Sequence, residues 1–195
     1  MLGAGYALIA DVDETWMLTG GAMLGILFTH WTHAVSGTES LDLNQLDAAE
    51  PTYGYRVLLV ATLHSAVEGV ALGAAMAADI RFGAFMALVI ALHNVPEGTI
   101  LAAVFRGQGV QLRHGTGLVV ASNLSQILLA VAIFAVIEAA PRVLPWASGF
   151  AMGGMVNLVF VELLPESYEQ AGRTSIALVG ALALATVLLV QGILA

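Results

Sequence analysis

The chain has 195 residues, of which 59% are hydrophobic and only 10% are charged, and its formal net charge is −8. A soluble domain of this size is roughly a quarter charged, so this composition predicts a polytopic membrane protein. The sequence has no Cys, which excludes disulfides and thiolate metal sites. The acidic balance argues against a nucleic-acid partner, because nucleic-acid binding needs a basic face.

Membrane helices are predicted from uncharged or nearly uncharged runs, because roughly 20 apolar residues span the hydrocarbon of a bilayer. Residues 1–10 are apolar but too short to cross, so we expect only a short helix remnant there. Six complete membrane helices are predicted near residues 16–35, 55–79, 83–104, 116–138, 145–165 and 175–195. The predicted fold class is therefore all-α: a polytopic transmembrane helix bundle that forms a single domain over residues 1–195.

Three connections between these helices carry clear sequence signals. The longest, residues 36–54, has the Ser, Thr, Asp and Pro content of a solvated loop. "AAPRVLP" (139–145) joins the fourth and fifth helices, and we expect its prolines to break both. "PESYEQAGRT" (165–174) joins the fifth and sixth helices.

The placement of Arg predicts the orientation of the bundle, since cytoplasmic loops are enriched in basic residues. One side of the predicted membrane carries four Arg and the other carries two: Arg56, Arg106, Arg113 and Arg173, against Arg81 and Arg142. This bias predicts that the loop 36–54 is cytoplasmic and that the C-terminus is outside. We expect an integral protein of the plasma (inner) membrane.

Two similar polar strings interrupt the second and third predicted helices, "LHSAVEGVAL" (63–72) and "ALHNVPEGTI" (91–100). His64 and Glu68 are four residues apart and so share one helix face, and His93 and Glu97 repeat that spacing. A tight turn near Arg81 makes the two helices antiparallel neighbours. Each string begins about ten residues into its helix, so at about 1.5 Å per residue both lie near mid-depth.

Two imidazoles and two carboxylates at one depth suit a borderline divalent cation such as Zn²⁺ or Fe²⁺. An isolated carboxylate at the centre of a bilayer is costly, and a bound cation or a shared proton removes much of that cost. The alternative is that each polar residue only bonds a neighbouring helix. The occurrence of two copies on paired helices favours the cation site.

Pro96 and two glycines add to this prediction. Pro96 prevents the helix hydrogen bond to the carbonyl of Leu92, which gives a further oxygen ligand, a gating kink or an ordinary membrane-helix kink. Gly69 and Gly98 each follow a glutamate of the two strings. Because glycine lets backbones approach closely, we expect tight helix packing at both positions.

These strings resemble the ZIP (Zrt/Irt-like protein) family of divalent metal transporters. "HNVPEG" (93–98) resembles the signature of that family's fifth helix, and "HSAVEG" (64–69) is similar to the fourth. Three further segments resemble the end of the second helix, the third helix and the seventh helix: "GAGYALIADVDE" (3–14), "GGAMLGILFTHWTHAV" (20–35) and "GFAMGGMVNLVFVELLPES" (149–167). The resemblance covers nearly the whole chain and implies an N-terminally truncated relative that lacks the first helix and most of the second.

The resemblance implies a divalent metal cation transporter that imports Zn²⁺ or Fe²⁺ toward the cytoplasm by alternating access around a mid-membrane site. The implied metal ligands are His64, Glu68, His93 and Glu97, with an adjacent second position formed by Ser65, Asn94 and Gln126. Ser65 and Gln126 are weaker ligands than Asn or a carboxylate, so we expect one good site. The metal is the substrate, no organic cofactor is expected, and Gly and Ala in 20–25 and 149–154 permit a homodimer.

Other polar residues are candidates for a metal pathway. His30 and His33 lie on one face near the cytoplasmic end of their helix, where they could collect metal or serve as interfacial residues beside Trp31. Glu162 could line a route or be an interfacial charge. Asn123 could line the path or bond across helices.

Two alternative functions stay open beside transport. One is a non-transporting relative or fragment that only binds metal. The other is an intramembrane metal-dependent hydrolase, which needs three protein ligands, an open water position and a general base. The sequence has no HExxH, and the symmetric placement of the two glutamates suits a path better than a directional reaction. We therefore predict that the protein is not an enzyme.

Overall fold

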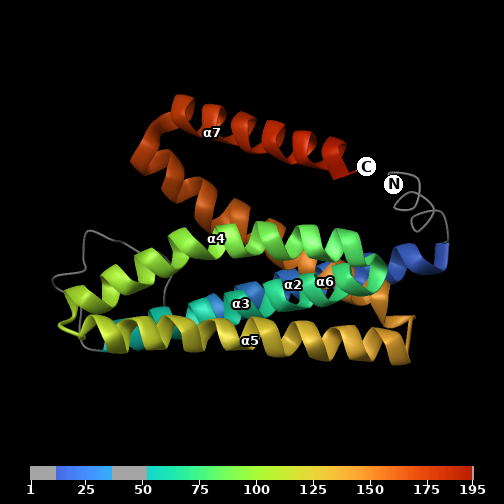
Figure 1. Cartoon of the computed structure of the whole chain (residues 1–195), viewed down its shortest axis with the longest axis horizontal. Coiled ribbons are helices and arrows are strands. Elements are labelled where there is room, and N and C mark those ends of the chain that lie inside the picture. Colours follow the sequence, from blue (N-terminus) through green and yellow to red (C-terminus); the bar gives the residue numbers. More distant parts are fainter. Residues whose placement is uncertain (1–11, 37–51, 195) are drawn as a thin grey trace.

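The computed structural model describes residues 12–36 and 52–194, and every regular element in this part of the chain is helical. The elements in order are α2 (Val12–Ser36), α3 (Thr52–Ala78), α4 (Ile80–Gly107), α5 (Leu112–Ala139), α6 (Val143–Leu158), the π-helical turn η2 (Val159–Leu163) and α7 (Leu164–Leu194). The predicted all-α class is confirmed. Figure 1 shows α3 running through the middle of a helix bundle, while α7 stands apart from it.

Four of the described helices are long and apolar enough to cross a membrane: Gly54–Ala78, Ile80–Gly107, Leu112–Ala139 and Val143–Val161. They coincide with the second to fifth predicted helices. The first predicted helix, 16–35, lies within α2. The sixth, 175–195, falls in α7, whose shorter apolar stretch is Thr174–Thr186. The count of six membrane helices stays a prediction.

The structure differs from the predicted connections at two prolines. Residues 165–174 are helical and belong to α7, so they do not form a loop. Pro145 lies inside the first turn of α6 and does not break it. Pro145 occupies the first turn of α6, where a missing backbone N–H leaves no hydrogen bond unmade. Pro165 follows the π-helical turn η2 inside a helix that continues from α6 into α7, and such local π adjustments let membrane helices tolerate proline. The predicted loop 36–54 is helical at Ser36 and from Thr52; residues 37–51 and the predicted remnant 1–10 lie outside the described part.

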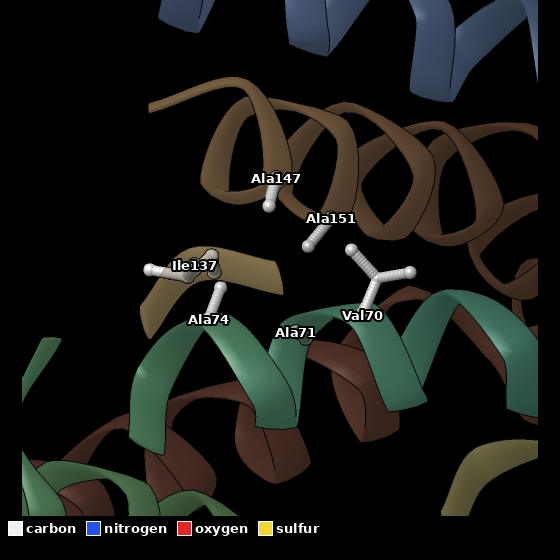
Figure 2. Packing of buried hydrophobic residues seen from close by; sticks show 6 residues of the cluster. All are labelled: Val70, Ala71, Ala74, Ile137, Ala147 and Ala151. Carbon is white, nitrogen blue, oxygen red and sulfur yellow. The ribbon is translucent and has the colours of Figure 1, made fainter. Parts of the chain in front are cut away.

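The helix α3 is the central element of the bundle. It packs against α2, α4, α5 and α6, and 61% of its most apolar part is buried, compared with 22% for α4 and 17% for α5. Two apolar clusters hold it. The first joins α3 to α5 and α6 through Val70, Ala71, Ala74, Ile137, Ala147 and Ala151 (Figure 2). The second joins α3 to α4 through Val57, Ala61, Leu101, Val104 and Phe105.

A single residue joins α3 to α4. The helix α3 ends at Ala78 and α4 begins at Ile80, so Asp79 alone makes the turn. Its backbone is extended, and its carboxylate Oδ1 accepts hydrogen bonds from the backbone N–H groups of Arg81 (2.9 Å) and Phe82 (2.8 Å). This N-cap satisfies donors that the helix itself leaves unpaired. The predicted antiparallel pairing of the two helices is confirmed.

The helices α2 and α6 form the most closely packed pair in the described chain. A Cβ added to Gly21 or Gly25 would collide with the backbone of α6, at the carbonyls of Trp146 and Phe150. A Cβ added to Gly149 or Gly153 would likewise collide with the backbone of α2. Small residues at these positions let the two backbones touch, which is how membrane helices gain van der Waals contact.

Candidate metal centre

The helices α3 and α4 bring the four predicted primary ligands to one place. His64, Glu68, His93 and Glu97 each offer one ligand atom, and these atoms all lie within 4.8 Å of one another. His64 and Glu68 are near the middle of α3, and His93 and Glu97 are near the middle of α4. Among the described residues, this is the group of His and acidic side chains whose geometry could hold a metal ion.

Glu68 lies at the centre of the group. Its carboxylate Oε1 is 3.7 Å from Nε2 of His64 and 3.6 Å from Nε2 of His93. Ligand atoms that surround a tetrahedral Zn²⁺ at about 2.05 Å are separated from one another by about 3.4 Å. The observed separations differ from that value by a few tenths of an ångström, so small side-chain shifts would bring the atoms into coordination distance.

The two imidazoles approach from opposite helices with nearly parallel planes. Their ring centroids are 6.4 Å apart and the planes are inclined by 24°. The Glu68 side chain is 4% exposed and that of His64 is 19% exposed, whereas the His93 side chain is 49% exposed. The group is therefore closed on the α3 side and open on the α4 side.

A set of amides on α5 and α4 lies beside Glu68. The amide nitrogen of Gln126 donates to Glu68 Oε2 at 3.1 Å. The amide of Asn94 donates to Gln126 Oε1 (2.9 Å) and to Asn123 Oδ1 (3.1 Å). In its other amide orientation, Asn94 donates to Glu68 Oε2 (3.2 Å) and to the carbonyl of Ile90 (3.3 Å). In both orientations these amides link α5 to the helices that carry the four ligands.

Gly69 explains why α5 comes so close. A Cβ at this position would lie 2.5 Å from the carbonyl oxygen of Gln126 and 3.0 Å from its Cα. The close approach predicted at Gly69 is confirmed, and it lets the Gln126 side chain reach Glu68. At Gly98, a Cβ would meet only a side-chain methyl of Val119, at 3.2 Å. The two backbones are therefore not in contact at Gly98.

The remaining predicted site residues have different positions. Ser65 is 1% exposed on α3, next to His64. Asn94, Asn123 and Gln126 are brought together by hydrogen bonds. His30 is exposed on α2 and is not part of the four-residue group. The side chains of His33 and Glu162 lie outside the described part of the chain, although Glu162 falls in the backbone of η2.

Two further polar contacts join helices. The hydroxyl of Ser125 donates to the carbonyl of Thr62 at 3.0 Å, which ties α5 to α3 two residues before His64. The amide of Asn157 donates to the hydroxyl of Thr29 at 2.9 Å, between α6 and α2. Thr29 is 2% exposed. A lone Asn within a glycine-rich apolar helix is the sequence signal that could have indicated the second contact.

The fold and the centre together define a helical protein with several membrane-length apolar helices and a His/Glu group suited to a divalent metal. No protein-family profile matches the chain, and no solved structure matches it. The chain is similar to a protein of Arabidopsis thaliana named "Putative zinc transporter", with 30% identity over 186 residues that cover 91% of the chain. It spans 30% of the length of that relative.

Proposed function

We propose that the chain is a ZIP-type divalent metal transporter that moves Zn²⁺ or Fe²⁺ through the membrane by alternating access around His64, Glu68, His93 and Glu97. The observation that carries the proposal is the convergence of these four side chains within 4.8 Å in the middle of two membrane-length helices. The name of the Arabidopsis relative supports a metal as substrate. Ser65, Asn94 and Gln126 stay a proposed weaker position beside the main one.

The ligand chemistry supports a transported ion. Two imidazoles and two carboxylates bind a borderline divalent cation and cancel its charge, which lowers the cost of holding it away from water. A carrier needs a site near mid-depth that can be reached from either side. The four ligands lie near the middle of two helices of membrane length, and the His93 side chain is half-exposed.

The direction and setting of transport are part of the proposal. The Arg bias supports a cytoplasmic loop at 36–54 and an outside C-terminus. Import toward the cytoplasm is proposed from the resemblance to ZIP transporters. The plasma (inner) membrane and a homodimer complete the proposed setting, although the glycines that were expected to permit a dimer pack α2 against α6 within one chain. His30, His33, Glu162 and Asn123 stay proposed pathway residues.

A metal-dependent hydrolase is less well supported. A hydrolytic zinc needs an open water position and a general base beside its protein ligands. Both glutamates of the centre belong to the same group of four as the histidines. An arrangement in which every acid–base group is a candidate ligand suits binding and release of the ion better than activation of water.

The experiment is metal uptake into proteoliposomes that contain the purified chain, with Zn²⁺ and Fe²⁺ as separate substrates. The test variant is His93→Ala combined with Glu97→Ala. The control combines His114→Ala with Glu138→Ala, which removes one exposed histidine and one exposed glutamate of α5 outside the centre. We expect uptake by the wild type and the control, and none by the test variant.

Binding measured on the same samples separates the alternatives. Stoichiometric binding that is lost in the test variant, without uptake by the wild type, would identify a metal-binding protein that does not transport. Uptake that persists in the test variant would contradict the proposed site. Metal-dependent cleavage of a peptide or lipid would support the hydrolase.

A further inference from the structure

The carboxylate of Glu68 has two oxygens in different surroundings. Oε1 faces Nε2 of both histidines, at 3.6 and 3.7 Å. Oε2 faces away from them and accepts a hydrogen bond of 3.1 Å from the amide nitrogen of Gln126. The Glu68 side chain is 4% exposed, so water does not reach its second oxygen freely. A buried carboxylate oxygen needs a donor, and Gln126 supplies it.

The Gln126 side chain is itself held in place. It is 6% exposed, and its Oε1 lies 2.9 Å from the amide nitrogen of Asn94. Its backbone packs directly on Gly69, the neighbour of Glu68. When Asn94 adopts its other amide orientation, it donates to Glu68 Oε2 at 3.2 Å in place of Gln126, and its oxygen accepts at 2.9 Å from the Gln126 amide, which turns with it. In either orientation, an amide N–H group donates a hydrogen bond to Oε2 of Glu68.

An amide nitrogen that donates a hydrogen bond has no lone pair for a cation. The hydrogen bond engages one lone pair of Oε2, so Oε1, which lies 3.6 and 3.7 Å from the two imidazoles, is the oxygen better placed to bind an ion. We propose that Gln126 is a positioning residue that, directly or through Asn94, holds Glu68 as a one-oxygen ligand and thereby makes the centre favour small, four-coordinate ions such as Zn²⁺ over ions that prefer more ligands. This inference rests on the proposed metal site, and it extends that site to the choice of ion.

The selectivity follows from how divalent ions use carboxylates. Zn²⁺ in proteins is commonly satisfied by four ligands in a tetrahedron. Mn²⁺ prefers six oxygen-rich ligands, and larger hard cations often take both oxygens of one carboxylate. A Glu68 released from Gln126 could offer both oxygens to the ion. The coordination number at the centre would then rise, and the centre would no longer favour four-coordinate Zn²⁺ over ions that prefer more ligands.

The test uses Gln126→Leu, which keeps much of the side-chain volume but has no donor. Binding of Zn²⁺, Mn²⁺ and Co²⁺ is measured on the purified full chain in detergent. We expect Zn²⁺ affinity to fall by about 10-fold or more, the usual effect of removing an outer partner of a ligand. Mn²⁺ affinity should fall less, so that the ratio of the two affinities falls.

Cobalt provides a readout that loss of packing alone would not change. Four-coordinate Co²⁺ absorbs visible light much more strongly than six-coordinate Co²⁺, so its spectrum reports coordination number. The wild type should give the strong bands and Gln126→Leu the weak ones. Ser122→Ala is the matched control, because Ser122 lies one turn before Gln126 on α5, is 3% exposed, and donates only within its own helix.

The outcomes separate this inference from the proposed function. A wild type that binds none of the three ions would overturn the metal site itself. A wild type that binds Zn²⁺ but gives a six-coordinate cobalt spectrum would overturn the inference without any variant. An unchanged affinity ratio and an unchanged spectrum in Gln126→Leu would also overturn it. If Gln126→Leu does not fold, as judged by circular dichroism and size-exclusion chromatography, Gln126→Met is the replacement.

Discussion

The pair α2–α6 and the group α3–α4–α5 are assembled by different means. In α2–α6, four glycines put backbone against backbone, and aromatic pairs such as Trp16 with Trp146 (centroids 5.2 Å apart) flank the contact. In α3–α4–α5, amides and a carboxylate bond across the helices beside the candidate metal centre. The first pair gains contact area, and the second group gains defined polar geometry.

This difference indicates a division of tasks within one bundle. Backbone contact between small residues depends on shape and tolerates no added atoms. Buried polar contacts hold particular atoms at particular distances, and each loses its value when a partner is removed. The chain therefore has one region in which volume is restricted and another in which donors and acceptors are restricted. Substitutions of each kind test that contrast.

The largest effect is expected from added volume in α2–α6. Gly25→Leu would drive a side chain into the carbonyl of Phe150 and should destabilise the fold by about 3 kcal/mol or more, as overpacking does at its upper end. Thermal unfolding in detergent, followed by circular dichroism, measures this loss. Gly117→Ala is the control, because nothing lies within 4 Å of a Cβ there. Equal unfolding temperatures for the two variants would show that the tight packing of α2–α6 is unnecessary.

The next effect is stabilisation of α3–α4 by metal. Zn²⁺ at 100 times its dissociation constant should raise the free energy of unfolding by about 2.7 kcal/mol. His and Glu must lose their protons to bind the ion, so protons compete and the gain should shrink as the pH falls. Unfolding scans with and without Zn²⁺ between neutral and acidic pH measure it. A gain of the same size at every pH, or one retained in the variant with His93→Ala and Glu97→Ala, would contradict the assignment.

The smallest effect is expected from the single polar contact between α2 and α6. Asn157→Leu removes the hydrogen bond of 2.9 Å to Thr29 while keeping much of the volume. One such bond between membrane helices contributes about 0.6 kcal/mol, with values up to about 1.7. The same unfolding assay should therefore show a small decrease, and Zn²⁺ affinity should be unchanged. A decrease as large as that of Gly25→Leu would mean that the contact, and not the glycines, holds the pair.

The repeated spacing made the centre predictable from the sequence. His64 and Glu68 had to share a helix face, and the short turn before Arg81 had to return the chain beside them, so convergence with His93 and Glu97 followed. The spacing of residues along the sequence could not predict how α5 is rotated, and this rotation directs the Gln126 side chain toward Glu68. That rotation depends on the backbone contact at Gly69, which forms only when the two helices are already packed.

The ends of the helices were less predictable than their middles. Pro165 was expected to end a helix, but it lies in the first turn of α7, just after the π-helical turn η2. In η2, the N–H of Leu164 bonds the carbonyl of Val159, five residues back. This wider turn leads the chain into α7 without a break. The proline alone could not show this, because a membrane helix tolerates an internal proline where a local π-helical adjustment satisfies the freed backbone groups.

The one-residue turn at Asp79 has a mechanical consequence. A turn with no spare residue gives α3 and α4 no slack, so neither helix can slide along its own axis without carrying the other. His64 and His93 therefore keep a common depth however the bundle moves as a whole. Asp79 therefore fixes the register of α3 against α4. The ligands whose relative position depends on this register lie about four helical turns away, on both helices.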